Sequence, residues 1–407
     1  MRINKPEQSY DLVVVGGGMV GASFACAIGN QDLSVLVVEA VAPNSGSLSQ
    51  PSFDARSTAL SYGSSRIFER MGLWQQLAEV VTAIKEIHVS DKGRFGAAQL
   101  SHKEHQVEAL GYVIENRKLG MVLNTTMEAS KAIHLFCPAS ISSINPNQAG
   151  MTLSVNDKTD SHSISTSLVV LAEGGRSPVC DQLGITRTEE HYKQHALIAN
   201  IVFEKPHHNI AYERFTDTGP LAVLPLESIG QQNRGSLVWT LSEQQSTEFM
   251  SMDDAELLEK LQERFGNRLG KLQQIGERFC YPLVLSLAKE QIRPGLVLLG
   301  NVAHTLHPVA GQGLNLALRD TAALVEILQK AHSDAKPLGD MSVLQQYLNR
   351  QKSDQDRAIK LTDYMTRLFS TNSNVSAWVR KFGLLSIDLL PSIRRSFADQ
   401  AMGLSDH

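Results

Sequence analysis

Three glycines near the N-terminus have the spacing of a phosphate-binding turn. Gly16, Gly18 and Gly21 follow the pattern GxGxxG directly after an apolar run. In such a turn the first glycine allows a tight bend, the second lets backbone approach a pyrophosphate, and the third lets the helix pack closely. Glu39 follows 18 residues after Gly21, where a carboxylate can hold the ribose of an adenosine. We predict a dinucleotide site; the alternative is a glycine turn with a structural acid.

A second stretch, residues 294–318, carries no formally charged residue, although histidine, amide and glycine residues interrupt its apolar positions. These interruptions break the run of about 20 apolar residues that a membrane helix needs. The pattern predicts a strand at 296–299 and a helix at 314–328, which puts the turn at 311–313 at a helix N-terminus. Amides there can stabilise the negative charge of a reduced flavin. We predict that the stretch faces a flavin ring and its ribityl chain.

A third motif, LAEGGRSP, follows another apolar run. Its glycines, Gly174 among them, let the backbone approach a cofactor, and Glu173 and Arg176 are charges close by. A surface turn with an exposed ion pair is the alternative.

Two histidines in the uncharged stretch, His304 and His307, could suggest a metal site. Pro308 and the glycines make their segment irregular, and no third ligand is close in sequence. We therefore predict no metal, and a structural or flavin-adjacent role for His307 with Pro308. The four cysteines are far apart and form no CxxC pair, so neither a zinc site nor a disulfide framework is indicated, and a disulfide reductase is disfavoured.

Length and charge narrow the function further. A chain of 407 residues is longer than one core usually supports, which predicts two domains. The net charge of -4, without a basic stripe, disfavours nucleic acid as a partner. The N-terminus lacks a secretory pattern, so we predict a cytoplasmic protein with reduced thiols.

Local patterns predict the elements that position these motifs. Strands at 12–15 and 34–38 flank a helix that ends at Gly29, which forms a βαβ unit. Residues 86–100 read as a hairpin and 196–239 as further strands of one antiparallel sheet. An amphipathic helix at 253–265 is predicted to bury one face, formed by Ala255, Leu258, Leu261 and Phe265.

The predicted fold is α/β, with a Rossmann-like FAD-binding domain interleaved with an antiparallel-sheet substrate domain, plus C-terminal helices. The predicted boundaries are 1–80, 106–185 and 276–335 for the FAD-binding domain, 81–105 and 186–275 for the substrate domain, and 336–407 for the helical region.

The three motifs, in this order, carry a family resemblance. The chain resembles the aromatic-hydroxylase class of FAD monooxygenases, which includes p-hydroxybenzoate hydroxylase, and within it the ubiquinone-biosynthesis branch that acts on 2-polyprenyl-6-methoxyphenol. The matching segments are VVVGGGMVGASFACAI, FDARSTAL, EIHVSDKG, LVVLAEGGRSP, YERFTDTGPLAVLPL and GNVAHTLHPVAGQGLNLALRD.

The resemblance implies a set of cofactor contacts. Gly16, Gly18 and Gly21 would hold the FAD pyrophosphate, and Glu39 the adenosine ribose. The residues implied at the flavin and its pyrophosphate are Arg56, Arg117, Gly311, Gln312, Gly313 and Asn315. The chain departs from the class at Asn301, where Asp is usual, and at Glu173, where Asp is usual; an Asn amide can still bond a ribityl hydroxyl, and the branch tolerates it.

The resemblance also implies the reaction. NAD(P)H reduces FAD, and the flavin with O2 forms a C4a-hydroperoxide that hydroxylates the ring of a polyprenylated phenol. No second GxGxxG motif follows a strand, so NAD(P)H would visit a shared cleft as a transient co-substrate. The substrate-side candidates are Tyr212, Glu213, Arg214 and Pro220, with His307 and Pro308; ordinary strand residues with an ion pair are the alternative for the first group.

The C-terminal part, from about 342 onward, is predicted to be helical. It mixes apolar residues such as Trp378 with basic residues such as Arg380, so core packing and docking on a membrane surface or partner are both open. A polyprenyl tail would favour peripheral contact with the inner membrane and with other ubiquinone-biosynthesis proteins. Three alternative functions also stay open: a sister hydroxylase acting at another ring carbon, an FAD oxidoreductase without oxygen insertion, and a catalytically inactive assembly subunit.

Overall fold

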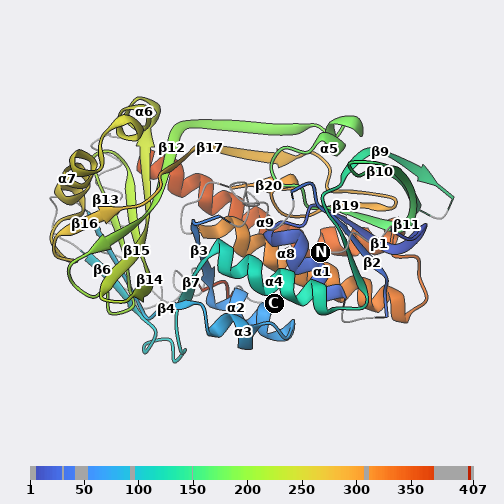
Figure 1. The fold of residues 1–407 in the computed structure, drawn as a ribbon, viewed down its shortest axis with the longest axis horizontal. Helices are drawn as coiled ribbons and strands as arrows, with labels where there is room; N and C mark the ends of the chain where they lie inside the picture. The colour runs from blue at the N-terminus through green and yellow to red at the C-terminus, as the bar shows by residue number, and fades with distance from the viewer. Residues whose placement is uncertain are drawn as a thin grey trace.

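The computed structural model describes residues 6–29, 32–41, 54–91, 97–148, 150–306, 311–370 and 402–404. Figure 1 shows two large sheets at opposite ends of the longest axis, with helices α8 and α9 between them. A three-stranded sheet, β3-β7-β4, lies with α2 and α3 beside these helices. Its elements are β3 (Ser57–Ser61), β4 (Thr82–Ile84), β7 (Gly111–Glu115), α2 (Tyr62–Arg70) and α3 (Trp74–Ala78).

The first sheet has a parallel centre in the order β19-β11-β1-β2-β8, extended at β11 by the antiparallel strands β10 and β9. Its strands are β1 (Ser9–Val15), β2 (Val35–Val38), β8 (Ile133–Phe136), β9 (Ser140–Asn147), β10 (Gly150–Asn156), β11 (Ser161–Leu171), β18 (Ile292–Arg293) and β19 (Leu296–Leu298). The predicted βαβ unit is confirmed, with β1 and β2 in parallel register.

Both faces of this sheet are buried, which explains the unbroken apolar runs of its strands. Leu12 and Val14 pack toward the helices, whereas Val13 and Val15 belong to the cluster on the opposite face. The helices are α1 (Met19–Ile28), α4 (Asn116–Ala129), α8 (Gln312–Ser333) and α9 (Met341–Ser370), and a short α5 (Pro178–Gln182) lies on the other side.

The second sheet has the order β20-β17-β12-β15-β14-β13-β5-β6, with β16 beside β12. The predicted hairpin of β5 and β6 is confirmed. β5 and β13 pair in parallel, so the sheet is mixed rather than wholly antiparallel as predicted. Its strands are β5 (Glu86–Asp91), β6 (Ala97–Ser101), β12 (Arg187–Phe203), β13 (Ile210–Phe215), β14 (Pro220–Ile229), β15 (Gln232–Ser242), β16 (Leu272–Ile275), β17 (Phe279–Ala288) and β20 (His304–Thr305).

Helices α6 (Glu243–Ser251) and α7 (Asp254–Phe265) cover one face of this sheet. The buried face of α7 differs from the predicted one: Leu257 is buried, whereas Ala255 is exposed. Leu257, Leu261 and Phe265 follow an i, i+4, i+8 stripe, which holds one side of the helix against the sheet. The opposite face of the sheet is left free to line a cavity.

The strand pairing also crosses the predicted domain boundary at 275. β17 and β20 belong to the second sheet, although the range 276–335 was assigned to the FAD-binding domain. The cause is the 17-residue length of β12, which pairs with β17 from Arg187 to Ile198.

In the C-terminal part, α9 confirms the predicted helix from about 342. Trp378 and Arg380 lie outside the described residues. In the ranges that the structure describes, no helix has both the length and the apolar character required to span a bilayer.

Candidate cofactor and substrate site

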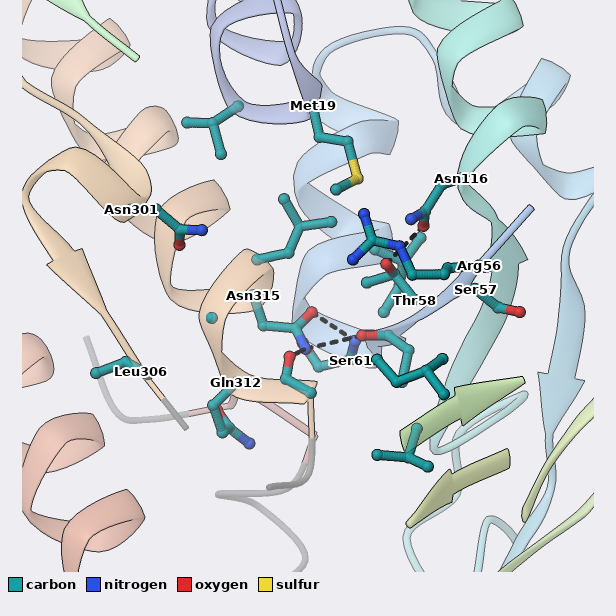
Figure 2. Close-up of a pocket in the computed structure, with 18 of the residues that line it drawn as sticks. Met19, Arg56, Ser57, Thr58, Ser61, Asn116, Asn301, Leu306, Gln312 and Asn315 are labelled. Carbon is teal, nitrogen blue, oxygen red and sulfur yellow. Dashed lines mark hydrogen bonds between the residues drawn. The ribbon is translucent and has the colours of Figure 1, made fainter. Parts of the chain in front are cut away.

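A cavity of about 1010 Å³ lies between the first sheet, the N-terminus of α8 and the free face of the second sheet. All the predicted cofactor residues line it except Gly21 and Arg117. Motifs that are up to 300 residues apart in sequence therefore meet at one site. Figure 2 shows part of this lining, with Arg56 and Asn116 on one side and Asn301 and Gln312 on the other.

The glycine turn connects β1 to α1 with almost no space for side chains. Gly16 has φ of +101°, and a Cβ there would lie 2.6 Å from the carbonyl oxygen of Ala172. A Cβ on Gly21 would lie 1.9 Å from the carbonyl oxygen of Gly16, so Gly21 serves close packing rather than the cavity surface. Gly18 caps α1 without a side-chain hydrogen bond, which leaves the first amides of the helix available to an anionic ligand.

Glu39, just after β2, fixes the glycine turn from the side. Its two carboxylate oxygens accept hydrogen bonds from the amides of Gly17, at 2.7 Å, and Val41, at 2.8 Å. An ionised carboxylate offers about four acceptor positions. Glu39 therefore holds the turn and keeps acceptor capacity for hydroxyl groups inside the cavity.

The LAEGGRSP segment also reaches the cavity, with Glu173 and Gly174 in its lining. Gly174 has φ of +92°, a conformation that favours glycine. Glu173 accepts a hydrogen bond from the hydroxyl of Ser177. Burial raises the pKa of Glu173 above its usual value, although the Ser177 bond opposes the rise. This arrangement favours the cofactor role over an exposed turn.

The uncharged stretch passes from β19 through a short 3-10 turn, η2 (Gly300–Val302), to the start of α8. Gly311 is the N-cap of α8 with φ of +62°, so the predicted helix N-terminus at 311–313 is confirmed. Asn301 and Gln312 line the cavity close to this end. The first amides of a 22-residue helix thus face the cavity and favour negative charge there.

Asn315, one turn into α8, has its whole amide occupied by the protein. Its Oδ1 accepts from the amide of Ser61 at 2.8 Å and the hydroxyl of Ser64 at 2.7 Å, as Figure 2 shows for Ser61. Its Nδ2 donates to the carbonyls of Ala59 and Gly311. An amide has two donors and two acceptor positions, so this side chain holds the loop in place.

The two predicted arginines have different surroundings. Arg56 lines the cavity, pairs with Asp54 at 2.5 Å and lies 4.7 Å from the ring centre of Tyr281. Arg117 has a side chain that is 54% exposed, pairs with Glu115 and lines a separate space of about 310 Å³. The structure therefore does not bring Arg117 to the large cavity.

Sequence reasoning missed Asn116, the residue before Arg117. Asn116 is 3% exposed, lines the cavity and accepts a 2.7 Å hydrogen bond from Thr58 Oγ1. The ENRKL segment pointed to this place in the fold, but only the helix orientation decides which of the two neighbours faces inward.

The structure brings only some of the substrate-side candidates to the cavity. Arg214 and Pro220 line the cavity together with Glu213. Tyr212 does not line it, and its ring packs edge-on against Phe265 of α7 at 5.8 Å. His307 and Pro308 lie outside the described residues.

His304 is buried away from solvent in contact with α8. Its Nε2 lies 2.6 Å from Asp320 Oδ2, and neither side chain is exposed. Gln355 of α9 donates to the other oxygen of Asp320 at 3.1 Å. These contacts join β20, α8 and α9 behind the site, so the role of His304 is structural.

Comparison with known proteins gives consistent matches. A family model described as FAD binding domain matches residues 9–356. The chain is 32% identical over 396 residues to the ubiquinone hydroxylase UbiL of Rhodospirillum rubrum, covering 97% of this chain and 89% of that protein. It is 29% identical to 3-demethoxyubiquinol 3-hydroxylase of Escherichia coli, and the match covers 98% of this chain and 99% of that protein. In fold it is similar to p-nitrophenol 4-monooxygenase PnpA of Pseudomonas putida, with a TM-score of 0.80 and 16% identity. This match covers 97% of this chain and 99% of that chain.

Proposed function

Since this chain belongs to the family described as FAD binding domain, we propose that it hydroxylates the ring of a polyprenylated phenol, most specifically 2-polyprenyl-6-methoxyphenol. The chain is an FAD-dependent monooxygenase of ubiquinone synthesis, and NAD(P)H is its transient co-substrate. The substrate and the ring position are the proposed part.

The observation that supports this proposal is the continuity of one cavity. The same space that contains the glycine turn and the α8 N-terminus extends along the free face of the second sheet. That face is mostly apolar, with Ala211, Ala222 and Val238 in the lining. A phenol with a prenyl chain could place its ring near the flavin and its chain along this wall.

The residues of the chain divide the work at this site. Backbone at Gly16 and Gly18 would bind the FAD pyrophosphate, Glu39 the ribose, and Asn301 the ribityl chain. The α8 amides would stabilise negative charge at the pyrimidine edge. When bound, FAD supplies electron transfer from NAD(P)H and the activation of O2. The apolar wall would exclude water from the reaction.

A sister reaction at another ring carbon is the second candidate. It is favoured by the similarity, over nearly the full length of both chains, to 3-demethoxyubiquinol 3-hydroxylase. Only the identity of the product distinguishes the two reactions. A prenyl chain would also favour contact with the inner membrane and with other ubiquinone-biosynthesis proteins.

The proposed function is tested by mass spectrometry of prenylated intermediates in cells that lack the protein. We expect a 2-polyprenylphenol or 2-polyprenyl-6-methoxyphenol to accumulate, and the normal gene to restore ubiquinone. Gly18→Val should not restore it, because the side chain enters the pyrophosphate position. Gly184→Ala is the control outside the cavity, because an added Cβ there would have no atom within 4 Å. Its φ of +66° adds backbone strain of about 1 to 2 kcal/mol, so this variant also controls for a general loss of stability. Unchanged ubiquinone without a precursor, in cells without a redundant hydroxylase, would contradict the proposal.

A further inference from the structure

A single carboxyl group lies in the middle of the apolar cavity wall. One row of residues crosses six strands of the second sheet through paired positions. Every residue of this row lines the cavity. From β6 to β12 the row consists of Ala98, Val89, Glu213, Ala222, Val238 and Ile198. Glu213 is thus a charged residue type in a row that is otherwise alanine, valine and isoleucine.

Among the described residues, the neighbours of this carboxyl offer it no partner. Directly beside Glu213 lie Val89 on β5 and Ala222 on β14, neither of which can donate from its side chain. Within the part of the chain that the structure describes, no side chain forms an ion pair with Glu213. Its neighbour Arg214 also lines the cavity, and its guanidinium lies 3.7 Å from where a Cβ on Gly266, at the end of α7, would stand.

The wider cavity does not neutralise the carboxyl either. The other titratable residues in the lining are Glu39, Arg56, Glu173, Arg176, Arg214 and Tyr364. Burial alone raises the pKa of Glu213, without a contribution from a neighbouring charge. Glu213 is partly exposed to the cavity. A carboxyl without a charged partner on an apolar wall is costly, and such groups concentrate at functional sites.

We propose that Glu213 accepts a hydrogen bond from the hydroxyl group of the phenol substrate and takes its proton during hydroxylation. This inference rests on the proposed function. The phenol O–H bond breaks, its electron pair stays on the phenol oxygen, and a new O–H bond forms on a carboxylate oxygen. No electron is transferred in this step. The resulting phenolate has a more electron-rich ring, which is the form that an electrophilic oxygen attacks most readily.

The local chemistry suits this role. A phenol has a pKa of about 10 and a free glutamic acid one of about 4.3, so proton transfer between them is unfavourable in water. Because burial raises the pKa of Glu213, the pKa values of the carboxyl group and the phenol become more similar, which favours proton transfer. The hydrogen bond would also orient the ring, since the apolar neighbours of Glu213 offer no competing polar contact.

The test uses the purified FAD-loaded protein with 2-geranyl-6-methoxyphenol as substrate and its methyl ether as a ligand that lacks the proton. Binding is followed by the change in flavin absorbance, and hydroxylation by product mass. We expect the wild type to bind the phenol about tenfold more tightly than the ether, as a hydrogen bond to a charged acceptor predicts. In Glu213→Leu this preference should disappear. Leu suits an apolar wall, so this variant is expected to fold.

Glu213→Gln separates binding from proton transfer. Its amide oxygen still accepts a hydrogen bond, so KM should stay close to that of the wild type, whereas kcat should fall about 100-fold or more. The loss of activity at acid pH, caused by protonation of Glu213 in the wild type, should be absent. Glu248→Gln, an exposed change on α6, should leave binding and rate unchanged.

Two results would overturn the inference in different ways. A wild type that hydroxylates the phenol, with Glu213→Leu retaining both kcat and the preference for the phenol, would contradict the role of Glu213 alone. A wild type that holds FAD but neither binds nor hydroxylates the phenol would contradict the proposed function, and the role of Glu213 with it.

Discussion

The backbone amide of Ser61 donates a 2.8 Å hydrogen bond to Asn315 Oδ1, which joins residues 254 positions apart. Ser61 ends β3 and caps α2, and Asn315 lies in the first turn of α8. The bond therefore connects the strand that follows Arg56 to the helix whose N-terminus faces the cavity. One amide side chain determines the position of two cavity walls.

Replacing Asn315 with Leu should weaken both the fold and cofactor retention. The amide of Ser61 and the carbonyls of Ala59 and Gly311 would lose their partner at a site that is 2% exposed. We expect the free energy of unfolding in urea to fall by about 3 kcal/mol and the protein to lose FAD on dilution. Asn349→Leu, an exposed change on α9, is the control. Normal stability in Asn315→Leu would show that the four bonds contribute little.

The pair of His304 and Asp320 should behave as a unit. Both side chains are fully buried. Removing Asp320 leaves His304 Nε2 without its partner, and removing His304 leaves Asp320 with only the hydrogen bond from Gln355. We expect His304→Leu and Asp320→Leu each to lower the free energy of unfolding by about 3 to 5 kcal/mol. The double variant should lose clearly less than the sum. Urea unfolding of all four proteins measures this coupling, and simple additivity would contradict it.

Local patterns predicted the parts of the fold that depend on neighbouring residues. The βαβ unit and the α8 N-terminus follow from apolar runs and glycines within about 30 residues. Which face of β13 lines the cavity cannot be predicted from such local patterns. It depends on the pairing of Glu213 with Val89, a residue 124 positions earlier. A shift of one residue exchanges the two faces of a strand. For this reason Tyr212 was placed among the cavity residues, although it packs on Phe265.

The same limit applies to the helices. Arg117 and Asn116 are adjacent at the start of α4, and only packing decides that Asn116 turns inward. On α7 the predicted face included Ala255, because its spacing allows two neighbouring stripes. The sheet selects the stripe with Leu257, which offers the larger apolar side chain.

The ion pair of Glu115 and Arg234 should make stability depend on pH. Burial opposes ionisation of Glu115. The hydrogen bond and charge of Arg234, at 3.0 Å, together with the charges of Arg117 and Lys118, outweigh this effect and lower the pKa of Glu115. In the unfolded protein the pKa of Glu115 is about 4.3. Because it is lower in the folded protein, the ionised carboxylate stabilises the fold at pH values above about 4.3. This contribution is lost as the pH falls through the folded pKa.

Arg234→Met should therefore cost about 2 kcal/mol at pH 7, and clearly less at pH 3. Urea unfolding of wild type and variant at both pH values measures the difference. Arg66→Met, which removes an exposed pair with Glu69, should have little effect at either pH. An equal cost of Arg234→Met at both pH values would show that lost packing, rather than charge, destabilises the variant.

Gly16→Ala should prevent FAD binding by distorting the turn that would hold its pyrophosphate. Gly16 has φ of +101°, and an added Cβ would lie 2.6 Å from the carbonyl oxygen of Ala172. Backbone strain in an alanine at positive φ costs about 1 to 2 kcal/mol, and the contact with Ala172 forces β1 and β11 apart as well. Gly72→Ala separates the two effects, because Gly72 also has positive φ but no atom within 4 Å of an added Cβ. Flavin absorbance of the purified proteins should be near zero for Gly16→Ala and normal for Gly72→Ala. Equal flavin content in both variants would mean that the turn tolerates a side chain, and that the close approach of Ala172 is not what shapes the site.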